Sequence, residues 1–164
     1  MTQQRVDPPW VAPEKETLLG FLEYQRATIA MKIEGLPEED ARRPIPPSSM
    51  SLLGIAKHLA FVERYWFQDV FAGQNVDYPW TDEDPNADFR IEDGESVTDV
   101  LALYRAEAAK SDQIVRGGGL GDTTEFRKQR MTLRWILAHL IEETARHTGQ
   151  ADIFRESIDG TTGE

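Results

Sequence analysis

Cysteine is absent from all 164 residues of the chain, and this absence removes several kinds of chemistry. Disulfide cross-links, thiolate metal ligands and a cysteine nucleophile are all excluded. A chain without cysteine also fits a reducing cytoplasm, where disulfides are rare. Any nucleophile or metal ligand must therefore come from other side chains or from a bound molecule.

Long apolar runs and an excess of positive charge are also missing. No segment approaches 18 consecutive apolar residues, and the opening MTQQRVDPPW lacks the apolar core of a signal peptide. Lysine and arginine number 18 against 29 acidic residues, and the net charge of −11 argues against a nucleic-acid or anionic-membrane surface. We expect a soluble cytoplasmic protein with one domain, residues 1–164, because this length buries a core without cross-links.

Strand-like alternation is scarce, whereas helical periodicity covers four long segments. Capping residues and glycines mark their ends. These segments predict an all-α four-helix bundle with long crossover connections. The predicted helices run from about Glu14 to Glu34, from a cap at Ser48 or Ser49 to about Phe71, from a capping box at Ser96 to about Arg116, and from a cap at Thr132 to about Ile158.

The remaining short segments are rich in proline or polar residues. Residues 1–13 hold three prolines and predict an extended arm, which Trp10 would anchor to the body of the protein. Residues 36–47 allow one short turn of helix, and residues 121–131 are polar and predict a loop. Residues 159–164 predict a frayed tail.

A long acidic connection, residues 74–95, separates the second and third predicted helices. A loop of this length within a compact domain often has a function. Trp80 and Phe89 would anchor it, so that it forms one wall of a pocket. The alternative is a strap that only covers the bundle.

The last predicted helix carries a carboxylate and an imidazole within its apolar stripe. If Ile136 is placed at zero, Glu143 falls at about −20° and His147 at about 20°, on the same face as Leu140 and Phe154. A charge buried on an apolar face needs a partner, and a metal ion would satisfy both groups. The alternative is that Glu143 pairs with an arginine of the same helix, Arg146 or Arg134, and that the histidines are ordinary, partly buried residues.

The choice of a complete ligand set depends on the other two histidines. His139 lies at about −60° on the same helix, roughly 80° from His147, so these two are poorly placed to share an ion. The second helix carries the remaining histidine, His58. The preferred set is therefore His58, Glu143 and His147, with His139 in a supporting or packing position. Two imidazoles and one carboxylate suit zinc, with nickel and iron as alternatives.

Four further residues are candidates for supporting roles. Glu63 lies near the middle of the apolar face of the second helix, so we expect it to pair with an arginine or a site histidine. Glu63 or His139 would then orient the metal ligands. Tyr65, Trp66 and Trp80 are candidates to line a substrate pocket, although aromatic residues at helical spacing usually belong to a core.

Two stretches, LGIAKHLAFVERYWF and HLIEETARHTGQADIFRE, resemble the DinB-like superfamily of metal-binding four-helix bundles. The resemblance extends to the opening VDPPWVAPEKETLLGFLEYQRATI and is closest to an actinobacterial branch related to mycothiol-dependent transferases and isomerases. It implies one ligand from the second helix and two from the last, namely His58, Glu143 and His147. Many members carry histidine at the position of Glu143, but the mycothiol-dependent maleylpyruvate isomerases resemble this chain in their His, Glu, His set.

The resemblance implies a metal-dependent S-transferase in which mycothiol supplies the sulfur that the chain lacks. A divalent ion with an open position lowers the pKa of a bound thiol, so the metal-bound mycothiol thiolate would attack a small electrophile in detoxification or stress. One alternative is a non-catalytic bundle that binds metal or dimerises, and another is a metal-dependent hydrolase. Homodimerisation is a further implication of the superfamily.

Overall fold

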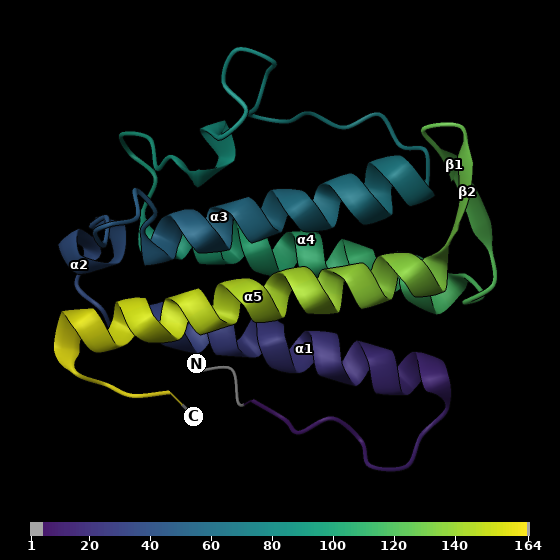
Figure 1. Ribbon diagram of the computed structural model, residues 1–164, viewed down its shortest axis with the longest axis horizontal. Coiled ribbons are helices and arrows are strands. Elements are labelled where there is room, and N and C mark those ends of the chain that lie inside the picture. The colour runs from purple at the N-terminus through teal and green to yellow at the C-terminus, as the bar shows by residue number, and fades with distance from the viewer. Residues whose placement is uncertain (1–4, 164) are drawn as a thin grey trace.

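The computed structural model describes residues 5–163 and is mainly helical (Figure 1). The predicted all-α four-helix bundle is confirmed, and the second helix consists of an α-helical and a π-helical part. The ends of the predicted arm and tail, residues 1–4 and 164, lie outside the described residues. The elements in order are α1 (Glu14–Ile33), α2 (Glu38–Arg42), α3 (Leu52–Glu63), the π-helix η1 (Arg64–Phe71), the short 3-10 helix η2 (Ala87–Phe89), α4 (Val97–Gly117), β1 (Thr123–Phe126), β2 (Gln129–Thr132) and α5 (Leu133–Asp159).

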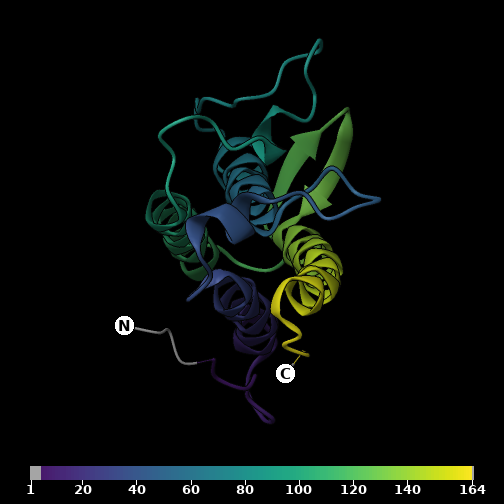
Figure 2. The same cartoon turned by 90° about the vertical axis from the view of Figure 1, so that its left-hand side faces the viewer.

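The long helices surround a common core, with α1 and α3 on opposite sides of it (Figure 2). The connection between η1 and α4 runs back along α3, so that α3 and α4 point in the same direction (Figure 1). This is the long crossover that the sequence predicts. Helix α5 returns after the antiparallel β1–β2 hairpin and lies beside both α1 and α3 (Figure 2).

The helix ends follow the capping residues of the sequence with one exception. Thr132 caps α5 through its hydroxyl, which accepts a hydrogen bond from the backbone N–H of Trp135, and Ser96 forms the expected capping box with Asp99. The predicted cap of the second helix was wrong, because α3 is capped by Ser51. The hydroxyl of Ser48 instead accepts from the backbone of the nearby Met50, which closes a turn ahead of the helix.

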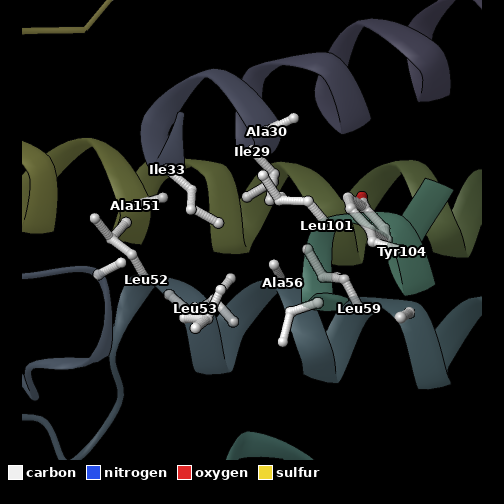
Figure 3. Close-up of a cluster of buried hydrophobic side chains, with 14 of the residues drawn as sticks. Ile29, Ala30, Ile33, Leu52, Leu53, Ala56, Leu59, Leu101, Tyr104 and Ala151 are labelled. Atoms are coloured by element: carbon white, nitrogen blue, oxygen red, sulfur yellow. The ribbon is translucent and has the colours of Figure 1, made fainter. Parts of the chain in front are cut away.

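The core consists of two apolar clusters, one toward each end of the bundle. One cluster combines residues of α1, α3, α4 and α5, and Figure 3 shows how its side chains meet between the helices. Full burial of a leucine or isoleucine contributes about 1.5–3 kcal/mol, so these clusters are the main source of stability. None of the helices within residues 5–163 combines the length and the apolar composition needed to cross a membrane. The second cluster contains Leu19, Leu22, Phe67, Val115, Leu133, Ile136, Leu137 and Leu140.

Two predictions outside the helices were wrong. The polar segment expected to be a loop forms the β1–β2 hairpin, whose turn residues Arg127 and Lys128 have φ values of 50° and 66°. Such turns usually carry Asn-Gly, so the sequence lacks the usual hairpin signal. Trp10 does not anchor the arm, since it is 97% exposed. The arm instead contacts α1 through its prolines, because a Cβ at Gly20 would lie 2.6 Å from Cδ of Pro9.

Candidate functional site

Three residues that are distant in sequence meet where α3 faces α5. His58 comes from α3, and Glu143 and His147 come from successive turns of α5. Oε1 of Glu143 lies 3.4 Å from Nε2 of His58 and 3.3 Å from Nε2 of His147. One ligand-type atom from each residue lies within 4.8 Å of the other two. The structure thus brings together the three residues selected from the sequence.

The second nitrogen of each histidine is held by a neighbouring acceptor. Nδ1 of His58 lies 2.7 Å from Oδ2 of Asp88, and Nδ1 of His147 lies 2.7 Å from Oε1 of Gln150. Because these oxygens accept hydrogen bonds, each Nδ1 carries a proton, and each Nε2 faces Glu143, to which it donates when it is protonated. A divalent ion that replaced the Nε2 protons would meet two nitrogen lone pairs and one carboxylate oxygen at this point. Three electron-rich atoms that converge in this way fit a divalent cation, and the histidine pairing is typical of metal ligands.

The electrostatics of the three residues follow from the same contacts. Hydrogen bonds from His147 and His58 hold the pKa of Glu143 well below its usual range, against the opposing effect of burial. Burial lowers the pKa of His58, but its hydrogen bonds to Asp88 and Glu143 outweigh this effect and raise the pKa overall. The carboxylate is therefore ionised at neutral pH, as a metal ligand must be.

Asp88 and Gln150, which hold the two histidine rings, were not identified from the sequence. Asp88 is buried in η2, and its position against α3 depends on the path of the long acidic connection. Gln150 lies three residues after His147 on the same helix, so the helical spacing of α5 was a usable signal. The side chain of Gln150 would have been found by asking which neighbour fixes the second nitrogen of His147.

Close packing holds η2 against the histidine. The ring of Phe89 stacks on the ring of His58 with centroids 4.0 Å apart and planes inclined by 13°. This approach requires a glycine one helical turn earlier, since a Cβ at Gly54 would lie 2.4 Å from the backbone oxygen of Phe89. The bare backbone of α3 at this position therefore allows Asp88 and Phe89 to reach the histidine.

A pocket of about 250 Å³ opens beside His58. The π-helix η1 contributes Tyr65 and Trp66 to its wall, and the acidic connection contributes Trp80. The rings of Tyr65 and Trp80 are 6.2 Å apart. The three aromatic residues selected from the sequence therefore border one cavity next to the candidate ligands, and the connection forms part of its wall. The other lining residues are Val62, Pro85, Asn86, Asp88 and Phe89.

Glu63 makes its contacts away from this site. Both of its carboxylate oxygens accept hydrogen bonds from Arg26 of α1, at 2.7 and 2.8 Å. The pairing with an arginine agrees with one of the two partners expected from the sequence. Among the described residues, Glu63 forms no hydrogen bond or ion pair with His58, Glu143 or His147, and its bonds to Arg26 place it in the bundle core.

His139 lies half-buried among aromatic rings. Its ring stacks on Trp135 at 5.1 Å and meets the edge of Trp66 at 4.8 Å. These contacts indicate a packing role. The two arginines considered as partners of Glu143 bind other carboxylates: Arg146 pairs with Glu142, and Arg134 pairs with Glu14.

Comparison with known families agrees with this fold and site. The sequence profile described as Mycothiol-S-transferase matches residues 17–160, which include nearly all of the bundle. Comparison with curated proteins finds no match. Because the family match covers most of the chain, the protein belongs to the mycothiol-S-transferase family, within the DinB-like superfamily.

Proposed function

We propose that the protein is a divalent-metal-dependent S-transferase that joins a thiol of the mycothiol type to a small electrophile. The observation that carries this proposal is the convergence of two Nε2 atoms and one carboxylate oxygen beside an aromatic pocket. A divalent ion bound there would lower the pKa of the thiol so that it reacts as a thiolate at neutral pH. Zinc suits this ligand set best, with nickel and iron as alternatives.

Different residues of the chain would bind the ion and orient the histidine rings. His58, Glu143 and His147 are the proposed ligands, and the carboxylate offsets part of the charge of the ion. Asp88 and Gln150 hold the two rings so that their Nε2 atoms point inward. A divalent ion held by these three residues would keep a coordination position for the thiol.

The aromatic pocket beside His58 is the proposed position of the electrophile. Tyr65, Trp66 and Trp80 present flat apolar surfaces that exclude water and favour a planar molecule. The sulfur loses its proton to solvent, a bond forms between sulfur and carbon, and the leaving group departs with its electron pair. The chain contains no cysteine, so the sulfur of the product comes from the thiol substrate.

The proposal is tested by metal analysis and by turnover of the same samples. Protein without a histidine tag, and the variants His58→Ala and His147→Ala, are compared with His139→Ala as a matched histidine control. We expect near-stoichiometric metal and transfer of mycothiol to chlorodinitrobenzene in the wild type and in His139→Ala, with both lost in the other two variants. The formation of the thioether is followed by its absorbance.

The same experiment separates the competing functions. Hydrolysis of an ester or amide without added thiol, dependent on His58, would replace the transferase proposal with a metal-dependent hydrolase. Bound metal without any turnover would leave a non-catalytic metal-binding bundle. Failure to bind any divalent ion would refute the metal site.

A further inference from the structure

The β1–β2 hairpin carries three basic side chains that are not neutralised. Arg127, Lys128 and Arg130 are exposed, and none of them forms an ion pair within the described part of the chain. The other basic residues, Arg5 and Lys15 excepted, each pair with a carboxylate among the described residues. The chain as a whole carries a net charge of −11, whereas the short β1–β2 hairpin carries three unpaired cations.

The contacts of these side chains leave their charges available. Arg130 donates a hydrogen bond to the hydroxyl of Thr123 at 2.8 Å, which is a neutral partner. Glu125 is its cross-strand neighbour in the hairpin register, yet the two do not form an ion pair. The guanidinium of Arg127 lies over the ring of Phe126, 5.0 Å from its centroid.

The turn conformation makes the choice of residues unusual. Arg127 and Lys128 both have positive φ values, a conformation that Asn and Gly adopt more easily than long side chains do. A two-residue hairpin loop requires positive φ at both positions, so Arg and Lys occupy places where Asn and Gly would cost less.

A hollow of about 500 Å³ lies between the hairpin and the start of α5. Its lining residues include two arginines, Arg127 and Arg130, and two aromatic residues, Phe126 and Trp135. Guanidinium groups bind carboxylate, sulfonate or phosphate through paired hydrogen bonds, and the aromatic rings suit a flat apolar part of the same molecule. The remaining lining residues are Gln129, Met131 and Thr132.

This hollow adjoins the pocket beside the candidate metal ligands. Trp66 lines that pocket, and its ring lies 5.4 Å from Phe126 and 5.6 Å from Trp135, which line the hollow. Burial raises the pKa of the Tyr65 hydroxyl, and the positive charge of Arg127 opposes that rise, so the cation also acts on the pocket wall. Figure 2 shows the hairpin and the acidic connection on the same side of the bundle.

We propose that the electrophilic substrate is a flat molecule that carries an anionic group, held by Arg127 and Arg130 in the hollow. Its reactive carbon would lie in the pocket beside His58. The acidic connection on the other side of this pocket repels the anion, so the charges fix the orientation of the substrate. This inference rests on the proposed S-transferase function and names the substrate class for it.

Two electrophiles that share a ring and a leaving group, one of them charged and the other neutral, test the proposal. The first is a chlorodinitrobenzoate and the second is its neutral methyl ester, and transfer of mycothiol releases chloride from both. The double variant Arg127→Gln, Arg130→Gln is compared with Arg43→Gln, Arg105→Gln, which removes the same charge from exposed positions elsewhere.

We expect the hairpin variant to raise KM for the carboxylate by about tenfold and to leave its kcat nearly unchanged. For the ester, both KM and kcat should stay nearly the same. The control variant should leave KM unchanged for both substrates. Added salt should raise KM for the carboxylate only. Equal effects of the hairpin variant on acid and ester would overturn the proposal. So would equal effects of the two double variants on the carboxylate.

Equilibrium dialysis with dinitrobenzoate, which has no leaving group, separates this inference from the proposed function. Binding of the acid that is weakened in the hairpin variant, without turnover of any electrophile, would support the anion subsite and refute the transferase. If both electrophiles were turned over, but the wild type bound dinitrobenzoate no more tightly than the hairpin variant does, the anion subsite would be refuted. The transferase proposal would still stand.

Discussion

The carboxylate of Asp88 orients the ring of His58, because its Oδ2 atom lies 2.7 Å from Nδ1 of the ring. The carboxylate oxygen accepts this hydrogen bond, so Nδ1 carries a proton and Nε2 is the nitrogen that faces Glu143. Phe89, the next residue in the chain, stacks on the same ring at 4.0 Å and fixes its plane. Two consecutive residues of η2 thus hold the ring of His58 in place.

Replacing Asp88 with asparagine should weaken metal binding without removing a ligand. The amide loses the negative charge that holds Nδ1 protonated, and changes of this kind usually lower metal affinity by about 10- to 100-fold. Competition with a chromogenic chelator measures the affinity. Asp93→Asn is the control, since Asp93 is exposed in the same acidic connection. Equal affinities of the two variants would show that Asp88 does not support the site.

Replacing Glu143 with glutamine should have a larger effect, because Glu143 is the proposed carboxylate ligand. Its oxygen lies between the two Nε2 atoms, and the neutral amide is a weak ligand for a divalent ion. We expect the affinity to fall by more than about 100-fold in the chelator competition. Glu142→Gln removes the same charge from the adjacent exposed position. Unchanged metal affinity in Glu143→Gln would refute the ligand assignment.

Helical periodicity by itself predicts the part of the site that lies on α5. Glu143 and His147 are four residues apart, so regular helical geometry brings them to one face before any tertiary contact is known. His58 joined the set as the one histidine outside that helix and through the family resemblance. The position of Glu63 on an apolar face also predicts that it has a partner. The sequence does not identify this partner as Arg26, because the contact joins two different helices.

The features that the sequence did not reveal depend on irregular backbone or on tertiary packing. The contact of Asp88 with His58 requires the particular path of the acidic connection. The hairpin was missed because Arg127 and Lys128 occupy turn positions that usually carry Asn and Gly. Trp10 was expected to be buried because it is large and apolar, but prolines nearby make the contact with α1 instead.

Replacing Gly54 with alanine should destabilise the protein and disturb the site. Alanine favours helix by about 1 kcal/mol over glycine, but the added Cβ would lie 2.4 Å from the backbone oxygen of Phe89. Because that oxygen belongs to backbone, η2 must move, and overpacking of this kind usually costs about 1–3 kcal/mol. Urea unfolding and metal affinity should both report the change.

A second glycine provides the matched control for this experiment. Gly149 lies exposed in the interior of α5, and a Cβ there would meet no atom within 4 Å. Gly149→Ala should therefore stabilise the protein by up to about 1 kcal/mol. If Gly54→Ala stabilised the protein as much as Gly149→Ala does, the close approach of η2 to α3 would be refuted.

The buried carboxylate of Glu107 on α4 should make stability depend on pH in the acid range. Burial raises its pKa, but hydrogen bonds from Arg64, Lys110 and Gln68 outweigh this and lower the pKa to about 2 from the ordinary value of 4.5. The folded protein therefore holds this group ionised where the unfolded chain takes up a proton. The stability that Glu107 contributes is complete above about pH 4.5 and is lost as the pH falls toward 2.

Comparison of the wild type with Glu107→Gln isolates this contribution from the other acidic groups. At neutral pH the variant should be less stable by about 2–3 kcal/mol in urea unfolding, since the amide cannot bind the two cations as the carboxylate does. The difference should shrink as the pH falls below about 4.5. The exposed substitution Glu156→Gln should give a small difference at every pH. A Glu107→Gln difference that stayed constant down to about pH 3 would mean that the charge of Glu107 contributes nothing, and that the loss comes from packing alone.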